Sequence, residues 1–510
     1  MVKQAWGVMI AAPPAGGDRR MARRVRVYCT IVDAIRSGSL PPGTRLPSVR
    51  QLAAEWGYAR SAVEEAFAQL QIEGLIERRV GDGSYVAAAA PAATPPDSTA
   101  PTARPLSRSA QRVVNRFAAY FGMPTGQEVP QPLLAQQPLY PRAPLLRDFP
   151  LDVWRRLVSR AHGEAYRDHL NYGPSAGLPR LREAIARHLS LARATPVRPQ
   201  QVVVVHSPTH AFELLAKVLL EPGDKVWLES PGHGSLVSLF QVLGMQIVGV
   251  PLDAEGLDVE AGRARAPDAA LVYFHPITQY PTGVRTSPRR RAELLRWADT
   301  SGAWIVEGNF NDEITYDAQP PGTLWSMEES DRVLMMGTLE GIMFPALRLC
   351  YLVVPPHLVH VFVAMRGMLA DSSNVQLQMA LAWFMEEGHL AAHLRHLRRV
   401  GREHRAALAA ACERHLPAWA RLGPMDGGVT ACIHVPARLP DREVVRRIRE
   451  RGVVAASMSS TAMDPAHGNG IVVSYGAFDA FTIERAVVVI GQCLAEMAAS
   501  AGYQFAGENR

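Results

Sequence analysis

The stretch QVVVVHSPTHAFELLAKVLLEPGDKVWLES, residues 201–230, carries two runs of strand-forming residues separated by an amphipathic segment. The runs QVVVVHS and KVWLES are short, apolar and rich in valine, which is typical of buried strands. The segment AFELLAKVLLEPGD between them has the pattern of a helix with a glycine stop. Strand, helix and strand in this order predict an α/β fold.

The same alternation continues along the chain. Further strand candidates are MQIVGVPL, ALVYFHP and AWIVEGNF, and PRRRAELLRWADTSG is another helix candidate with a glycine stop. Such alternation implies a mainly parallel sheet covered by helices. We therefore assign residues 113–500 to one α/β body.

The composition is that of a globular protein with more than one core. The chain has 510 residues, of which 48% are hydrophobic and 20% charged. It has neither an uncharged apolar run of membrane-spanning length nor the apolar region of a signal peptide. Its five cysteines are scattered without a CxxC pair, which favours reduced thiols in the cytoplasm over disulfides or a metal site.

Positive charge is concentrated near the N-terminus. Residues 1–86 hold 12 lysines and arginines against 8 aspartates and glutamates, and residues 87–112 hold 3 against 1. The rest of the chain balances, with 39 of each sign. A basic module beside a neutral body suggests a polyanion as partner, although a solvated basic face would give the same count.

Residues 87–112 separate the basic module from the body. This segment, AAAAPAATPPDSTAPTARPLSRSAQR, lacks the apolar periodicity of a packed element, so we expect a flexible linker. The predicted organisation is a tail over residues 1–20, a first domain over residues 21–86, the linker, and the body over residues 113–500.

The first domain combines three helix patterns with one hairpin pattern. RVRVYCTIVDAIRSG, VRQLAAEWG and ARSAVEEAFAQLQIEG are helix candidates that end at a glycine, and Ser48 is placed to cap the second. LIERRVGDGSYVA alternates around the turn sequence GDG, which predicts two antiparallel strands. Two short helices joined by a tight turn and followed by a hairpin predict a winged helix-turn-helix.

This topology suits double-stranded DNA. Residues at the start of the second helix reach base edges, nearby arginines hold phosphates, and glycines let the wing backbone approach the duplex. The alternative is a module of the same topology that binds a protein, because a fold does not fix a function. By these criteria the candidate DNA-binding residues are Arg45, Ser48, Arg50, Arg60, Ser61, Gly81 and Gly83.

The phrases LPPGTRLPSVRQLA, ARSAVEEAFAQLQIEGLI and RRVGDGSYV together resemble the GntR-type DNA-binding domain along its whole length. The resemblance implies that Arg50 and Arg60 contact a double-stranded operator and that residues 81–85 form the wing. Glu64 departs from the pattern, because some relatives place a DNA-contacting arginine there. The operator sequence is therefore left open.

The body resembles the aminotransferase-like domain of the MocR subfamily of GntR regulators. The resemblance rests on FPLDVWRRL, NYGPSAGLPRLREAIARHL, LLEPGDKVWLESPGHGS, HPITQYPTG and FPALRLCY, in the family's order and spacing. It implies the fold-type I architecture of transferases that depend on pyridoxal phosphate (PLP), and a head-to-tail homodimer. A GntR module, a long linker and this body are the layout of the subfamily.

The residues for PLP chemistry are changed. PLP catalysis needs an amine for the imine, an acid beside the pyridine nitrogen and a cradle for the phosphate. In GTLEG, Gly341 stands where the resemblance implies the lysine. In EGNFN, Gly308 replaces the carboxylate and Phe310 replaces the tyrosine that meets the ring oxygen. In IVVSYG, Val472 stands where related enzymes hold a carboxylate-binding arginine.

Parts of a degenerate pocket are kept. Arg348 occupies the phosphate-arginine position, although an ion pair with Glu340 is an equal alternative. Thr338 keeps a hydroxyl, and the backbone after Ser207 could present donors to an anion. Glutamine and tyrosine of the HPITQYPTG phrase line the family's pocket or act as turn residues. The full set is Ser207, Thr209, Gln279, Tyr280, Gly308, Phe310, Thr338, Gly341 and Arg348.

We interpret the chain as a cytoplasmic MocR-type transcriptional regulator without catalytic residues, a metal or a covalent cofactor. Neither Lys217 nor Lys225 is placed to replace the missing lysine. The expected partners are a DNA operator, an unknown small-molecule effector and a second copy of the chain, and no membrane. Two alternatives are a working PLP enzyme fused to a DNA-binding module, and a regulator that holds PLP or another phosphorylated ligand noncovalently through Arg348 and Thr338.

Overall fold

The computed structural model forms two compact units, Met1–Pro105 and Leu106–Arg510, and each is taken by itself. The predicted tail, residues 1–20, and most of the predicted linker, residues 87–112, lie outside the described residues. The described residues are 23–79, 81–88, 106, 107, 109–111, 113, 114, 136–141, 143, 145–163, 167, 171–310, 312–316, 322–369, 374–500 and 502.

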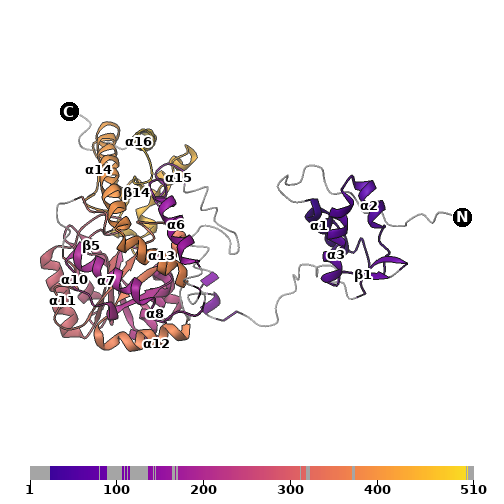
Figure 1. Ribbon diagram of the computed structural model, residues 1–510. Coiled ribbons are helices and arrows are strands. Elements are labelled where there is room, and N and C mark those ends of the chain that lie inside the picture. Colours follow the sequence, from indigo (N-terminus) through magenta and orange to yellow (C-terminus); the bar gives the residue numbers. More distant parts are fainter. Residues whose placement is uncertain are drawn as a thin grey trace. The chain divides into compact units, whose positions relative to one another are not determined.

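The first unit is a winged helix-turn-helix, as the sequence predicts (Figure 1). Apolar side chains from all of its helices and strands meet in one core. Gly57, with a φ of +68°, takes the left-handed conformation that ends the second helix and turns the chain into the third. The elements are α1 (Arg23–Arg36), α2 (Val49–Trp56), α3 (Arg60–Ile72), β1 (Ile76–Arg79) and β2 (Gly83–Val86).

An eight-stranded, mainly parallel sheet forms the centre of the second unit, and this confirms the predicted architecture. Strand β10 runs antiparallel to both of its neighbours, and β6 runs antiparallel to β5. The stretch quoted first supplies β3, α8 and β4, although other strands lie between β3 and β4 in the sheet. In spatial order the strands are β3 (Val202–Val205), β10 (Cys350–Val353), β9 (Val333–Thr338), β8 (Trp304–Asn309), β7 (Leu271–Phe274), β4 (Lys225–Ser230), β5 (Gln246–Asp253) and β6 (Gly256–Leu257).

Helices cover both faces of this sheet because its strands are apolar on both sides. Val203 and Val205 of β3 join one core, and Val202 and Val204 join the other. The first face carries α8 (Pro208–Leu219), α9 (Gly234–Val242) and α12 (Val359–Leu369). The second carries α6 (Leu151–Ala161), α7 (Pro179–Arg193), α10 (Val259–Arg265), α11 (Pro288–Ser301) and α13 (Val375–Glu386).

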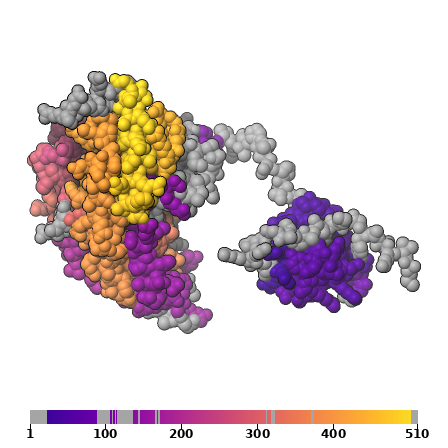
Figure 2. Space-filling view, turned by 90° about the horizontal axis from the view of Figure 1, so that it is seen from above, coloured from indigo at the N-terminus to yellow at the C-terminus, as the bar shows by residue number. Residues whose placement is uncertain are grey.

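The long helix α14 (His389–His415) leads from the large sheet to a smaller antiparallel sheet with its own core. Figure 2 shows α14 in orange and the last helix in yellow running side by side over this part of the unit. Val472 is fully buried in β14. No described helix has the length and apolar character needed to cross a membrane. The remaining elements are β11 (Arg421–Leu422), β12 (Thr430–His434), β13 (Ala456–Ser457), β14 (Gly470–Ser474), α15 (Asp441–Glu450) and α16 (Ala480–Ser500).

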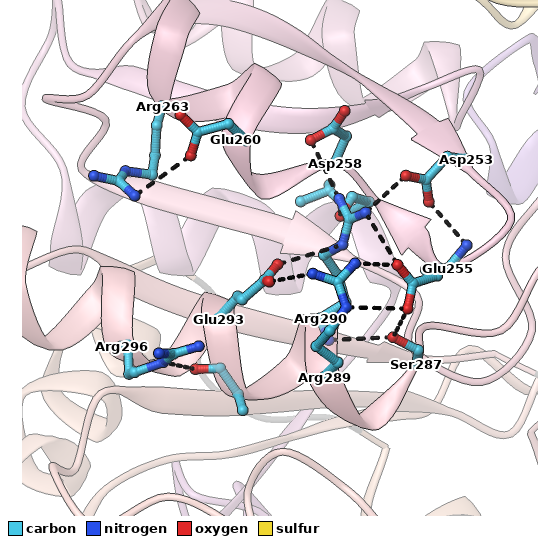
Figure 3. Close-up of polar contacts among 12 residues, drawn as sticks. Asp253, Glu255, Asp258, Glu260, Arg263, Ser287, Arg289, Arg290, Glu293 and Arg296 are labelled. Atoms are coloured by element: carbon cyan, nitrogen blue, oxygen red, sulfur yellow. Dashed lines mark hydrogen bonds and ion pairs between the residues drawn. The ribbon is translucent and has the colours of Figure 1, made fainter.

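A network of ion pairs fixes the β6 edge of the large sheet (Figure 3). Arg290 of α11 lies at its centre, with a side chain that is 7% exposed. Its guanidinium lies 2.7 Å from Asp253 and 3.2 Å from Asp258. Arg289 is exposed and pairs with Glu255. These contacts tie the β5–β6 hairpin and the start of α10 to α11.

Candidate nucleic-acid interface and cofactor site

The N-termini of α2 and α3 are built differently. Ser48 caps α2, because its Oγ accepts a hydrogen bond from Gln51 N at 3.3 Å and Gln51 Oε1 accepts one from Ser48 N at 3.1 Å. Helix α3 follows Ala59, which provides no side-chain cap, and begins with the exposed residues Arg60 and Ser61. The start of α3 therefore offers free N–H groups and a cation to a phosphate or a base edge.

A groove of about 520 Å³ lies between the start of α2 and the wing. Gly83 has a φ of +130°, and a Cβ atom there would lie 3.1 Å from Nε of Arg45. Glycine therefore lets Arg45 pack against the wing. The predicted DNA-binding residues that line the groove are Arg45, Ser48, Gly81 and Gly83, and those outside it are Arg50, Arg60 and Ser61.

Arginine side chains gather on the wing. Arg79 lies over the ring of Tyr85, 4.4 Å from its centroid, and Arg45 lies 3.8 Å from the carboxylate of Asp82. The Tyr85 hydroxyl donates to Asp82 at 2.9 Å, and this hydrogen bond raises the pKa of Tyr85. Arg79 is not among the predicted DNA contacts. Its position shortly before the GDG turn of the wing could have indicated that it faces DNA.

The predicted cofactor residues of the second unit meet at the carboxyl edge of the large sheet. This edge is where open α/β sheets bind ligands, because the loops after parallel strands converge there. The residues are Ser207 and Thr209 after β3, Gln279 and Tyr280 after β7, Gly308 in β8 and Phe310 after it, Thr338 at the end of β9, Gly341 in the following turn, and Arg348 before β10.

Gly308 has no room for a side chain. A Cβ atom there would lie 2.5 Å from Oη of Tyr273 and 3.0 Å from Nε2 of His275. Hydrogen bonds join Tyr273 Oη to His275 Nε2 at 2.9 Å and His275 Nδ1 to Glu229 Oε2 at 3.0 Å. Burial raises the pKa of Glu229 to about 8 and lowers that of His275 to about 3, so both are mainly neutral at pH 7. Neutral groups of the protein itself therefore fill the space beside Gly308.

Phe310 belongs to an aromatic cluster with His275, His233 and Tyr280. His233 stacks on Tyr280 with ring centroids 4.6 Å apart, and Phe310 lies 5.4 Å from His275. His233 precedes α9 and was not predicted as a site residue; its signal was its place in the phrase ESPGHGS. The aromatic side chains at this edge contact one another.

Arg348 forms the ion pair that was the alternative to a phosphate contact. Its Nη1 lies 3.4 Å from Oε1 of Glu340, and the side chains are 60% and 19% exposed, respectively. Burial raises the pKa of Glu340, and the charge of Arg348 opposes this shift. Oγ1 of Thr338 accepts hydrogen bonds from Glu340 N at 3.1 Å and from Cys350 Sγ at 3.2 Å. The retained hydroxyl and guanidinium thus both have partners within the fold.

The start of α8 is a poor anion cradle. Ser207 uses its hydroxyl oxygen to cap the helix by accepting from His210 N at 3.1 Å. Pro208 follows and has no N–H to donate. Thr209 is exposed and Ser207 is buried. Only part of the backbone expected to hold a phosphate can therefore donate.

Gln279 acts as a turn residue, which was one of its two predicted roles. Its Oε1 accepts from the Thr282 hydroxyl at 2.6 Å, and its Nε2 donates to the Pro231 carbonyl at 2.9 Å. The side chain is buried and fixes the loop after β7 against the loop after β4.

These residues do not fit PLP held through an imine. Gly341 has no amine, and Gly308 has neither a carboxylate nor room for one. Lys225 is the first residue of β4 and therefore lies at the opposite edge of the sheet, where it bonds to Asp268 at 2.8 Å. Lys217 lies in the last turn of α8, far from the capped start of that helix.

Two family models match the chain. "Bacterial regulatory proteins, gntR family" matches residues 23–86, and "Aminotransferase class I and II" matches residues 145–486, more than half of the chain. The "Probable rhizopine catabolism regulatory protein MocR" of Rhizobium meliloti is 30% identical over 462 residues, 91% of this chain and 92% of that protein. The "HTH-type pyridoxine biosynthesis transcriptional regulator PdxR" of Corynebacterium glutamicum is 29% identical over 460 residues, 90% and 93% of the two chains.

Solved aminotransferases share the fold of the second unit. The kynurenine aminotransferase of Pyrococcus horikoshii superimposes with a TM-score of 0.67 at 21% identity, covering 73% of this chain and 96% of its own. The α-aminoadipate aminotransferase LysN of Thermus thermophilus gives 0.68 at 23% identity, covering 78% and 98%. Together with the family matches and the identity to MocR, these findings show that the chain belongs to the MocR-type transcriptional regulators, in which a GntR DNA-binding domain precedes a fold-type I aminotransferase-like domain.

Proposed function

We propose that the aminotransferase-like domain of this regulator forms no imine with PLP and acts as a dimerisation and effector-sensing domain. The observation that carries the proposal is the closed space at Gly308, where Tyr273 Oη stands 2.5 Å from the place of a Cβ atom. Gly341, after a different strand, supplies no amine. A variant that restores only the amine at residue 341 therefore still lacks the carboxylate at residue 308, and a variant that restores only the carboxylate still lacks the amine.

In this proposal the aminotransferase-like domain controls how the DNA-binding domain binds its operator. A head-to-tail dimer would hold two DNA-binding units at a fixed separation and so select operators with matching half-sites. An effector that binds one arrangement of the dimer better than another would shift DNA affinity by at most that difference in binding free energy. We propose Arg45, Arg50, Arg60 and the wing glycines as the DNA-contacting residues, with Ser48 acting mainly as the cap of α2.

The test is titration of the purified protein with PLP, followed by visible absorption spectra before and after borohydride, with the Gly341→Lys variant alongside. We expect neither an imine band nor a reducible adduct in the wild-type protein. A borohydride-fixed PLP adduct on any lysine, located by mass spectrometry, would overturn the proposal. Light scattering measures the mass of the free protein, and a monomer would overturn the dimerisation role.

A second candidate is a phosphorylated ligand held noncovalently. One observation at His206, which lies between β3 and α8, favours it. Burial lowers the pKa of His206, and the charges of Arg366 and Arg348 lower it further, which indicates a positive electrostatic field at this position. The ion pair of Arg348 with Glu340 competes with such a ligand. Equal PLP affinity of the wild-type and Arg348→Ala proteins would exclude this candidate.

A further inference from the structure

We propose that Glu64 reads a cytosine in the operator and that Arg78 positions Glu64 to do so. The inference rests on the DNA-binding role of the first unit and adds a specificity-determining residue to it. It assigns functions to an acidic side chain on α3, the recognition helix of that role, and to an arginine of the wing, neither of which is among the predicted contacts.

Glu64 lies on the accessible side of α3. The buried side of the helix consists of Val63, Ala66, Phe67 and Leu70. Glu64 follows Arg60 by one helical turn, so the two side chains lie above one another on the exposed surface. A helix that presents Arg60 to the major groove therefore brings Glu64 to base pairs deeper in the same groove.

One oxygen of the Glu64 carboxylate is fixed and the other is available. Its Oε1 accepts a hydrogen bond from Nη1 of Arg78 at 2.7 Å, and its side chain is 48% exposed. No residue in the described part of the chain donates to Oε2. Because Arg78 belongs to β1, this ion pair ties the recognition helix to the wing and restricts the rotamers of Glu64.

Arg78 is suited to hold Glu64 rather than a phosphate. Its side chain is 31% exposed, and its guanidinium lies 5.9 Å from the centroid of the buried Phe67 ring. Its Nε and Nη2 atoms are buried and have no hydrogen-bond partner among the described residues, so they face the protein. Arg79, the next residue, is exposed and can reach a phosphate instead.

The chemistry of the pair favours cytosine. A carboxylate only accepts hydrogen bonds, and in the major groove cytosine offers the N4 amino group as a donor, whereas guanine and thymine offer acceptors. Adenine offers a donor beside an acceptor, so a carboxylate satisfies it less well. A lone carboxylate would also be repelled by the phosphates. Arg78 compensates that charge at 2.7 Å from the carboxylate.

The experiment selects bound sequences from a randomised duplex library with the full-length protein. The variants are Glu64→Ala, Glu64→Gln and Arg78→Gln. Glu65→Gln is the matched control, because Glu65 is the adjacent exposed carboxylate and its ion pair, with Arg24 at 3.5 Å, leads to α1 and not to the wing. Circular dichroism and thermal unfolding establish that each variant is folded.

We expect one position in each half-site to hold cytosine with the wild-type protein and with Glu65→Gln. Glu64→Ala should lose that preference: the ratio of its affinities for the cytosine-containing site and for the substituted sites should fall about tenfold from the wild-type ratio. Glu64→Gln should prefer adenine there, because a glutamine amide matches the donor and acceptor of adenine. Arg78→Gln should weaken the cytosine preference without changing the other positions.

Identical base preferences for the wild type and Glu64→Ala at every position would overturn the inference alone. A wild-type protein that shows no sequence preference and no salt dependence would instead overturn the DNA-binding role on which the inference rests. An equal change in Glu65→Gln would show that any loss of charge on α3 acts in this way, and would also overturn the specific role of Glu64.

Discussion

The two units of this chain treat their functional positions in opposite ways. In the first unit, Arg50 and Arg60 are exposed and form no ion pair with any residue that the structure describes. In the second unit, Arg348 pairs with Glu340, and the hydroxyl of the buried Thr338, at the end of β9, accepts a hydrogen bond from Glu340 N. The recognition arginines of the DNA-binding unit are thus exposed and unpaired among the described residues, whereas the retained polar groups of the aminotransferase-like unit have partners within the fold.

The difference has a physical reason at Gly308. A buried carboxylate is tolerated in a PLP site because the pyridinium of the cofactor compensates its charge. Without that cation it would be an uncompensated buried charge, which costs several kcal/mol. Glycine removes the charge, and Tyr273 and His275 fill the volume with neutral hydrogen-bonded groups. The fold keeps its core because its apolar faces never depended on the cofactor.

The largest effect should come from the outward-facing arginines. In Arg50→Ala/Arg60→Ala, the loss of a contact of about 1–3 kcal/mol at each position should lower operator affinity by about 4 kcal/mol, or roughly a thousandfold. Fluorescence anisotropy at several salt concentrations measures both the affinity and the reduced salt slope. Arg36→Ala, an exposed arginine at the end of α1, is the control. Unchanged operator affinity in the double variant would show that the exposed arginines of the first unit do not contact DNA, and the contrast between the two units would then fail.

The second largest effect should come from placing a carboxylate at the closed position Gly308. Gly308→Asp should lower the free energy of unfolding by about 3 kcal/mol, because its Cβ meets Tyr273 and its charge is buried. Denaturant unfolding followed by fluorescence measures the change. Adding Tyr273→Phe removes the atom that lies 2.5 Å from the new Cβ and should restore part of the loss. Wild-type stability in Gly308→Asp would mean that the space is open to a carboxylate.

The ion-pair network of Figure 3 sharpens the comparison, because there inward-facing charges are compensated. Arg290→Ala removes a side chain that is 7% exposed and leaves Asp253 and Asp258 without their cation. We expect a loss of about 2 kcal/mol in unfolding free energy, since these carboxylates are partly exposed and regain water. Arg289→Ala, one residue away and exposed, should be indistinguishable from wild type. Equal losses in both variants would show that the burial of an arginine does not determine how much its ion pairs contribute to the free energy of unfolding.

Much of the fold could be predicted from the sequence, because strands, helices and the wing are encoded by local periodicity. The order of β3 and β4 in the sheet could not, since four other strands lie between them and no local pattern records that. Loss of the amine at Gly341 was visible as a residue identity. The closure of the space beside Gly308 was not, because Glu229, Tyr273 and His275 come from two strand segments that only the fold brings to it.

The smallest effect concerns the proton on Glu229. Burial raises its pKa from 4.5 to about 8, so between these values the folded protein holds a proton that the unfolded chain releases. The free energy of unfolding should therefore fall as pH rises through this window, by at most about 1.4 kcal/mol per pH unit. Glu229→Gln, which keeps the shape of the neutral acid, should remove this slope.

His275 acts in the opposite direction, because its pKa is lowered from 6.5 to about 3 and protonation of the unfolded chain begins near pH 6.5. The comparison is therefore cleanest between about pH 6.5 and pH 8. Denaturant unfolding over this range is compared for the wild type, Glu229→Gln and the surface control Glu213→Gln. If the wild-type and Glu229→Gln slopes coincide, Glu229 is ionised in the folded protein. The site beside Gly308 would then hold a negative charge, and the loss of the Gly308 carboxylate would no longer distinguish its electrostatics from those of an enzyme's cofactor site.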